Sequence, residues 1–347
     1  MVGIADLREF CVSALVMGGA SPSDARTVSE VLIWAERRGR GPQGAIWLDA
    51  LTARLASDTI LSPTAIETVD DRGGLVILDA GGGLGHVAAT RAVDLVIERS
   101  AQHGIAAVAL RNSSHFGPCG YYASLLAGQG RLAIVATNAY PKVAPHGGVT
   151  PVLGTNPIGF ATPRTDSEPV IGDLSTGAVA GSRIRQALEA GVLFEEEVAV
   201  DEFGRASRDP AVLSNGGAML PVGGPKGTAL GLMVEALTSM LSGGATPDRL
   251  GSMFNDDAAV ATSHFVMGIA LPEGAPAHMS AIAGLFDATP SREGMAVRLP
   301  GTSRHNHDTD QDAVTLDNDT TAALWSTIDR VGIDVPAWLS GSASLDC

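Results

Sequence analysis

The stretch that decides the fold is residues 111–163, RNSSHFGPCGYYASLLAGQGRLAIVATNAYPKVAPHGGVTPVLGTNPIGFATP. It places one histidine, His115, in a dense run of Asn, Ser, Gly and Pro, the composition of loops that position functional groups. Apolar runs at 105–110, 132–138 and 158–163 read as buried strands. We therefore expect His115 between a strand that ends near Arg111 and a helix that begins after Pro118, with its ring facing a cleft.

The rest of the chain alternates helical and strand patterns. Apolar residues recur every three or four positions at 5–17 and 23–37, and Ser21-Pro22-Ser23 is a capping signal for the second helix. Further helices are expected at 86–104, 226–241 and 317–331, and further strands at 75–79 and before Asp173. This alternation predicts an α/β fold.

Composition limits the class of protein and its partners. The 347 residues exceed the size of one hydrophobic core, and no apolar run is long enough to span a membrane. No signal peptide is visible, and three cysteines without motif spacing favour a reducing cytoplasm. A net charge of −15 disfavours nucleic acid and anionic membranes as partners, so a small-molecule substrate is expected.

The glycine-rich segment DAGGGLGH, residues 79–86, follows a predicted strand and opens a predicted helix. Gly81, Gly83 and Gly85 give G-x-G-x-G rather than the G-x-G-x-x-G of a Rossmann phosphate loop, and the next strand ends at Arg111 instead of an acid. The segment is better interpreted as a tight turn.

Five further segments are candidates for a chemical role. His115 suits reversible proton transfer, with a buried structural histidine as the alternative. Residues 154–157 (GTNP) and 173–176 (DLST) suit a nucleotide contact or a simple helix cap. In 223–227 (GGPKG), Lys226 stands just before a helix N-terminus, as an anion site or a solvated lysine. Residues 304–308 (RHNHD) lack a third defined ligand, so an exposed loop is expected and no metal.

Four segments resemble the malate/L-lactate dehydrogenase family in their order and spacing, namely 111–163, DLST, GGPKG and VRLPGTSR (297–304). This family includes L-sulfolactate and ureidoglycolate dehydrogenases and a cyclic imine reductase. The resemblance implies a non-Rossmann α/β fold with a mixed, largely antiparallel sheet in the cofactor domain and a helical terminal unit. It also implies a homodimer with the active site near the interface. The expected reaction is hydride transfer between NADP or NAD and a carbonyl or imine carbon, most often beside a carboxylate.

The resemblance also implies domains and site residues. Residues 1–56 with 312–347 would form the helical unit, 57–115 with 275–311 a linking and dimerisation unit, and 116–274 the cofactor domain. His115 would be the proton acceptor and donor. The positions facing substrate would be Gln43, Trp47, Ala139 and Lys226. The positions holding the cofactor would be Gly117, Gly120, Thr155, Asp173, Leu174, Ser175, Lys226, Pro300, Gly301, Thr302 and Arg304.

The chain departs from the family at its substrate-facing positions. The family pattern Leu-Arg-Gly-x-x-Ser-His-Gly-x-x-Arg has Pro42 for Ser, Gln43 for His and Trp47 for Arg here, and Ala139 replaces a further serine. Either the substrate differs and is bulkier than pyruvate, or a catalytically silent nucleotide-binding dimer remains. The first interpretation is favoured because His115 is retained, and a cyclic imine reductase is the alternative enzyme.

One departure concerns the choice between NAD and NADP. Thr302 stands where the family usually has an acid near the adenosine ribose, and Arg304 follows two positions later. Loss of a carboxylate beside an arginine favours a 2′-phosphate, and hence NADP.

Overall fold

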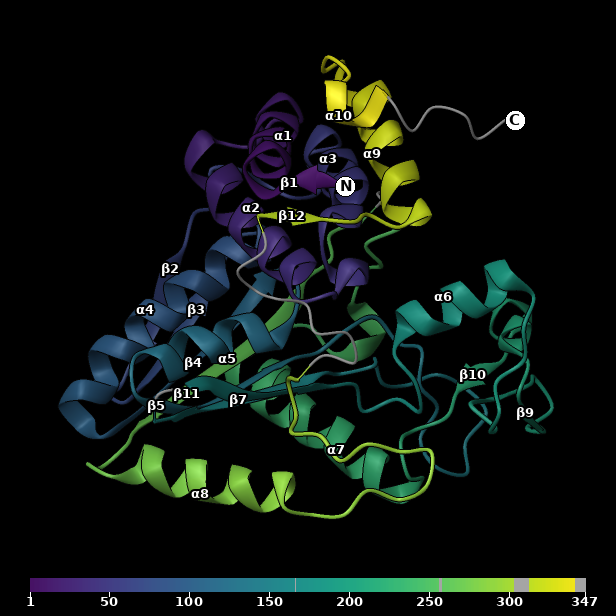
Figure 1. Cartoon of the computed structure of the whole chain (residues 1–347). Helices are drawn as coiled ribbons and strands as arrows, with labels where there is room; N and C mark the ends of the chain where they lie inside the picture. The colour runs from purple at the N-terminus through teal and green to yellow at the C-terminus, as the bar shows by residue number, and fades with distance from the viewer. Residues whose placement is uncertain (166, 256–257, 303–311, 341–347) are drawn as a thin grey trace.

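The computed structural model describes residues 1–165, 167–255, 258–302 and 312–340, and its centre is a seven-stranded sheet (Figure 1). The strand order is β2-β3-β4-β11-β5-β6-β7. β3 and β4 are parallel, and every other neighbouring pair is antiparallel. The bounds are β2 Glu67–Asp71, β3 Leu75–Asp79, β4 Ile105–Ser113, β5 Arg131–Thr137, β6 Ile158–Arg164, β7 Ser167–Leu174 and β11 Thr262–Ala270. The predicted mixed, largely antiparallel sheet is confirmed.

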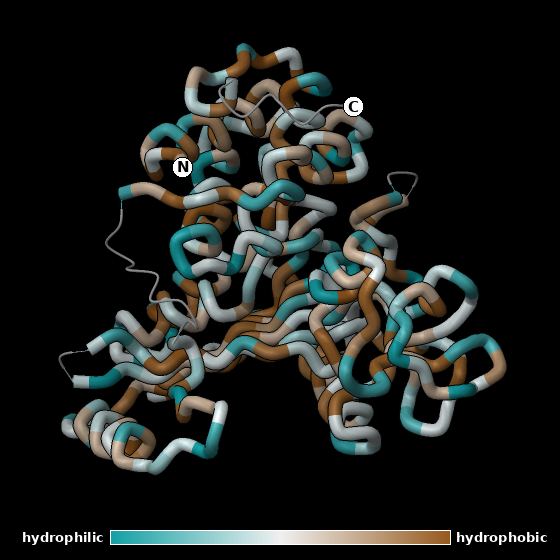
Figure 2. Tube along the Cα trace, turned by 45° about the vertical axis from the view of Figure 1, so that its right-hand side comes forward, coloured by the Kyte–Doolittle hydropathy of each residue, from teal (hydrophilic) through white to brown (hydrophobic). Residues whose placement is uncertain are grey.

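Helices cover both faces of this sheet (Figure 1). α4 (Gly85–His103) and α5 (Cys119–Gly128) pack on one face, where Val96 and Tyr122 are buried against sheet residues such as Val266. α7 (Pro225–Glu235), its π-helical continuation η4 (Ala236–Met240) and α8 (Ala275–Asp287) lie on the other face. The strands are therefore the apolar centre of the molecule, as the hydropathy colouring of Figure 2 shows.

The two ends of the described chain meet in a helical unit. α1 (Ile4–Met17), α2 (Pro22–Arg37), α3 (Leu48–Ala56), α9 (Asn318–Val331) and α10 (Ala337–Ser340) share one buried core. Strand β1 (Val2–Gly3) pairs with β12 (Ala313–Val314). The Ser21 side chain accepts a hydrogen bond from the backbone N–H of Asp24, which confirms the predicted cap of α2.

A smaller lobe lies beside the sheet (Figure 1). Its strands β8 (Ala199–Val200), β9 (Ala206–Ser207) and β10 (Ala218–Met219) form a sheet of order β10-β8-β9. α6 (Gly181–Ala190) and the 3-10 helix η3 (Pro210–Asn215) pack on it around a core that includes Ile184 and Met219. The remaining short 3-10 helices are η1 (Gly41–Gln43), η2 (Ala45–Trp47) and η5 (Pro247–Arg249).

The glycine-rich segment 79–86 joins β3 to α4 as a tight turn. Gly81 and Gly82 have φ values of 57° and 80°, and the Asp79 carboxylate accepts a hydrogen bond of 2.9 Å from the Gly81 N–H. A Cβ at Gly85 would lie 2.1 Å from the Ser114 carbonyl oxygen, so glycine allows α4 to begin against the His115 loop.

The predicted three-part domain division stays a prediction. One sheet contains strands from both sides of residue 115. None of the helices in the described ranges is long and apolar enough to cross a membrane. Cys11 and Cys119 are buried free thiols.

Candidate functional site

A cavity of about 900 Å³ opens between the helical unit, the loops at the ends of β4 and β5, and α6. This volume lies in the range of small-molecule and cofactor sites, roughly 300–1,000 Å³. The structure brings together on its wall six of the positions expected from the sequence, which are Gln43, Trp47, His115, Gly117, Ala139 and Thr155.

The backbone holds His115 as the sequence predicts, between a strand and a helix. β4 ends at Ser113 and α5 begins at Cys119. The Ser114 hydroxyl donates to the Gly83 carbonyl at 3.1 Å and accepts from the Gly85 N–H at 2.9 Å, which fastens the loop to the start of α4. Gly117 makes the turn into α5 with a φ of 81°.

The His115 ring is enclosed by aromatic neighbours. The Trp47 indole stacks on it with ring centroids 3.8 Å apart and an interplanar angle of 18°. Nε2 of His115 is buried and has no hydrogen-bond partner among the described residues. Burial lowers the pKa of His115 to about 3, so its imidazole is neutral near pH 7.

A second histidine, which the sequence analysis missed, supports the loop that carries His115. His264 on β11 lies with Nε2 3.1 Å from the Ser114 carbonyl oxygen and Nδ1 2.7 Å from the Thr137 hydroxyl. A carbonyl only accepts hydrogen bonds, so Nε2 carries the proton. The Phe116 ring stacks on His264 at 4.2 Å. The only sequence signal for His264 is a histidine within the strand TSHFVMGIA.

A buried carboxylate, also missed, fixes the loops on another side of the cavity. Glu235 on α7 accepts hydrogen bonds from the side-chain amides of Asn156 at 2.8 Å and Asn138 at 3.2 Å. Asn156 in turn accepts from the Ala139 N–H at 3.1 Å. The repeated Thr-Asn pairs at 137–138 and 155–156 were the available signal, and their amides position Ala139 and Thr155.

The positions where the chain departs from the resemblance lie close together. The Trp47 indole N–H donates to the Pro42 carbonyl at 3.0 Å, so this donor is already used within the protein. The buried Oε1 of Gln43 has no partner in the described part of the chain. Phe254 extends the aromatic wall, with its ring centroid 5.5 Å from that of Trp47. Position 47 is therefore an apolar wall instead of a charged clamp.

The sequence profile of the malate/L-lactate dehydrogenase family matches residues 2–325. The chain belongs to this family. It is 35% identical over 306 residues to a (2R)-3-sulfolactate dehydrogenase (NADP(+)) from Chromohalobacter salexigens, covering 88% of this chain and 91% of that protein. A Δ1-pyrroline-2-carboxylate/Δ1-piperideine-2-carboxylate reductase from Pseudomonas putida is 33% identical, covering 70% and 71%.

Solved structures confirm the family fold. The sulfolactate dehydrogenase from Methanocaldococcus jannaschii superposes with a TM-score of 0.86 at 27% identity, covering 96% of this chain and 98% of that chain. Family membership confirms the expectation of an NAD(P)-dependent oxidoreductase of the α/β, non-Rossmann type.

The remaining predicted cofactor positions that the structure describes lie outside the cavity wall, and several meet at β7. The Gly120 N–H donates to Asp173 at 2.9 Å, and Asp173 is paired with Arg40 at 3.2 Å. Burial raises the pKa of Asp173, and the Arg40 charge opposes this shift. A Cβ at Gly301 would lie 2.7 Å from the Ile171 carbonyl oxygen, so the segment of Pro300, Gly301 and Thr302 also borders this strand.

Other predicted positions are scattered around this group. The Ser175 hydroxyl donates to the Thr155 carbonyl at 3.2 Å, which links it to the cavity wall, whereas the Leu174 side chain is exposed. Lys226 is exposed and lies in the first turn of α7 instead of before it, and it does not line the cavity. Arg304 and the two histidines of 304–308 lie outside the described residues.

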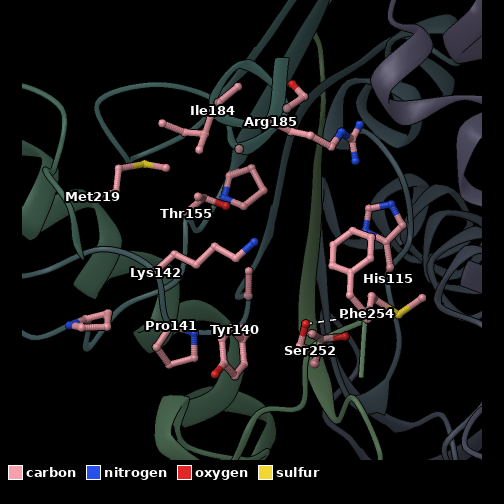
Figure 3. Close-up of a pocket in the computed structure, with 18 of the residues that line it drawn as sticks. His115, Tyr140, Pro141, Lys142, Thr155, Ile184, Arg185, Met219, Ser252 and Phe254 are labelled. Carbon is pink, nitrogen blue, oxygen red and sulfur yellow. Dashed lines mark hydrogen bonds between the residues drawn. The ribbon is translucent and has the colours of Figure 1, made fainter. Parts of the chain in front are cut away.

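Most of the cavity wall consists of residues that were not predicted as site positions, and three of them have side chains of particular interest. Lys142, Arg185 and Phe254 all line the cavity, and Figure 3 shows Lys142 extending into it. Lys142 follows the Thr-Asn pair in the stretch 111–163, whereas Arg185 lies on α6 without a recognisable motif.

Proposed function

We propose that this cavity is the hydride-transfer site of an enzyme that acts on a 2-oxo or 2-hydroxy acid bulkier than pyruvate. The observation that carries the proposal is the buried Nε2 of His115, which has no partner in the described structure, on a wall that Trp47 makes apolar. In oxidation, the neutral imidazole accepts the proton of the substrate hydroxyl. In reduction, a protonated His115 returns it to the carbonyl oxygen.

The cavity fits a nicotinamide cofactor. Gly117 and Thr155 on its wall would hold the nicotinamide end, and a Cβ at Gly117 would lie 2.8 Å from Val31 Cγ1, so glycine lets the backbone at this part of the wall pack against the core. Asp173, Ser175 and the segment of Pro300 to Thr302 border β7 and would hold the remainder. The cofactor supplies or takes up the hydride at the reacting carbon. Thr302 in place of an acid favours NADP over NAD.

Cyclic imine reduction is the second candidate, and one observation favours it. Burial lowers the pKa of His115 to about 3, so the protein holds little protonated His115 at neutral pH. An imine that is already protonated in solution needs no enzyme acid. A similar chain from Pseudomonas putida is named as a reductase of such cyclic imines.

A dinucleotide titration tests the proposal. NADPH and NADH are added separately while nucleotide fluorescence is followed, and NADPH is expected to bind at least tenfold more tightly, about 1.4 kcal/mol. Preference for NADH would contradict the argument from Thr302. Failure of both to bind would contradict the proposed hydride transfer. With the dinucleotide bound, paired 2-oxo acids and cyclic imines then decide between the two reactions.

We also propose that the chain is a cytoplasmic homodimer. Leu232, Met240 and Leu285 are 63%, 73% and 68% exposed, and α7 and α8 lie on the same side of the sheet (Figure 1). Several large exposed apolar side chains on one side of a molecule favour a protein interface there. Light scattering after size-exclusion chromatography is expected to give twice the 35.4 kDa chain mass, and a monomer at micromolar concentration would contradict the proposal.

A further inference from the structure

The cavity carries two cations that the proposed proton transfer does not use. Lys142 comes from the loop after β5, and Arg185 comes from α6. Figure 3 shows both side chains among the residues of the cavity wall, with the Lys142 ammonium between the small lobe and the side that holds His115 and Phe254. Both side chains therefore line the same cavity.

The protein backbone fixes the position of Lys142. Its N–H donates to the Leu153 carbonyl at 2.9 Å, and its carbonyl accepts from the Met219 N–H at 2.9 Å. The side chain then reaches toward Phe254, with the ammonium nitrogen 5.9 Å from the ring centroid. The ammonium is thus held at the end of an aromatic wall that continues through Phe254 and Trp47 to His115.

Neither cation has a carboxylate partner within ion-pair distance among residues 1–165, 167–255, 258–302 and 312–340. Nε of Arg185 is buried and has no hydrogen-bond partner there either. Burial, and secondly the neighbouring Arg185, lower the pKa of Lys142. Two like charges in a partly buried space repel, and an anion between them would remove this cost.

We propose that Lys142 and Arg185 form the anion-binding end of the substrate pocket and take a carboxylate or sulfonate that is remote from the reacting carbon. This inference rests on the proposed function, which places the reacting carbon beside His115. The rings of Phe254 and Trp47 lie between the two ends, so the body of the substrate is apolar. The Lys142 ammonium thereby binds the negative charge of the substrate, which the Trp47 indole cannot do.

A cofactor phosphate is the other source of such an oxyanion. The substrate is favoured because the positions matched to the cofactor by family resemblance meet at β7, around Asp173 and Gly301, and Lys142 is not among them.

A labelling experiment tests the anion site without turnover. The chain has two lysines, Lys142 and Lys226, so reductive methylation with ¹³C-formaldehyde gives two side-chain NMR signals besides the N-terminus. Lys142→Met assigns them. With NADPH saturating, adipate is expected to shift the Lys142 signal saturably, whereas the neutral adipamide leaves it in place. The Lys226 signal is expected not to move.

Three outcomes of this titration would overturn the proposal. They are no response of Lys142 to adipate, an equal response to adipamide, and an equally large response to NADPH alone, which would assign the cations to a cofactor phosphate. Failure of every dinucleotide to bind would instead refute the proposed function, and the adipate titration would still report on the cation pair.

Turnover provides a second measurement, with two six-carbon substrates that differ by one carboxylate. For the native chain, kcat/KM is expected to be about tenfold or more higher for 2-oxoadipate than for 2-oxohexanoate, since a charged hydrogen bond is involved. Lys142→Met and Arg185→Gln are expected to reduce this ratio toward one, and Lys142→Arg to retain most of it. Equal kcat/KM values in the native chain would overturn the proposal.

Arg183→Gln is the matched control for loss of one positive charge from α6. Arg183 is exposed, lies over the Phe194 ring at 6.0 Å and does not line the cavity. Its replacement is expected to leave the substrate ratio unchanged. A loss of the ratio in Arg183→Gln as large as in Arg185→Gln would show that net charge, not the site, sets the preference, and would also overturn the proposal.

Discussion

Trp47 covers one face of the His115 imidazole, at 3.8 Å between ring centroids, while its own N–H is bonded to the Pro42 carbonyl. The indole therefore presents no free donor to a substrate. It lies against the imidazole, and the burial of this ring is the physical cause of the low pKa of His115. The proposed proton-transfer group and the proposed specificity wall are therefore one packed unit.

The first prediction concerns His115 as acid and base. His115→Asn removes the titrating ring but keeps hydrogen-bonding capacity, so kcat is expected to fall about 10²-fold or more. Dinucleotide affinity is expected to change little. Steady-state kinetics and fluorescence titration measure the two quantities.

The same variant also separates the two candidate reactions. A protonated cyclic imine needs no enzyme acid, so its reduction is expected to withstand His115→Asn better than 2-oxo acid reduction does. Near-normal 2-oxo acid turnover in the variant would show that the proton comes from another group or from solvent.

The second prediction concerns pH and the buried His264. Burial lowers its pKa to about 3, compared with about 6.5 in the unfolded chain. Below pH 6.5 the unfolded state therefore binds a proton that the folded state does not, and stability falls as the pH falls. This one group is expected to reduce the free energy of unfolding by about 2 kcal/mol between pH 7.5 and 5.0.

Urea denaturation at the two pH values measures this effect. His264→Gln is expected to be less stable than the native chain at pH 7.5 but to lose about 2 kcal/mol less on acidification. His278→Gln, which replaces an exposed histidine on α8, serves as the control and is expected to retain the native pH dependence. An unchanged pH dependence in His264→Gln would mean that His264 is protonated in the folded state.

Much of the fold could be predicted from the sequence because local signals and packing agree. The apolar periodicity of 23–37 with Ser21 before it matches α2, and the apolar runs at 75–79 and 158–163 match β3 and β6 within about one residue. The position of His115 between β4 and α5 follows from the same pattern. Strand order could not be read from periodicity, since β11 inserts between β4 and β5 from more than 120 residues away.

The site was predicted only where a motif marked it. His264 and Glu235 act through contacts between segments far apart in the chain, and no local spacing predicts such contacts. Arg185 lines the cavity from α6 without a recognisable motif. Lys226 had the clearer motif, yet it is exposed outside the cavity, whereas Lys142 lines it. The backbone of Lys142 is held by hydrogen bonds to Leu153 and Met219, which no local pattern predicts.

The third prediction concerns Arg54, a fully buried side chain on α3. Its guanidinium donates to backbone carbonyls of the loop that carries Phe254, namely those of Ser252, Met253, Asn255 and Ala258. Arg54→Met would leave several buried carbonyls without a donor, so the free energy of unfolding is expected to fall by roughly 3 kcal/mol or more. KM for the organic substrate is expected to rise because Phe254 loses its support.

Chemical denaturation and kinetics test Arg54 together. Arg8→Met is the control, because Arg8 pairs with Glu30 on the surface and such a pair contributes at most about 1 kcal/mol. Equal destabilisation of the two variants would contradict a special role for Arg54. A destabilised Arg54→Met with unchanged KM would show that the loop keeps its position without this contact.

The last prediction concerns the double replacement Gln43→His with Trp47→Arg. Arginine can donate two parallel charged hydrogen bonds to a carboxylate. The Trp47 indole has one N–H, which already donates to the Pro42 carbonyl, and its ring buries apolar surface. The native chain is expected to reduce pyruvate and oxaloacetate poorly, and the double variant to raise kcat/KM for them about tenfold or more. Activity on bulkier substrates is expected to fall, because Phe254 would lose its aromatic neighbour at 5.5 Å.

Trp47→Phe is the control that keeps an apolar wall and is expected to give no gain on pyruvate. Robust native activity on pyruvate, without any gain in the double variant, would place this chain with dehydrogenases of small 2-hydroxy acids, because the wall at position 47 would then not restrict the substrate.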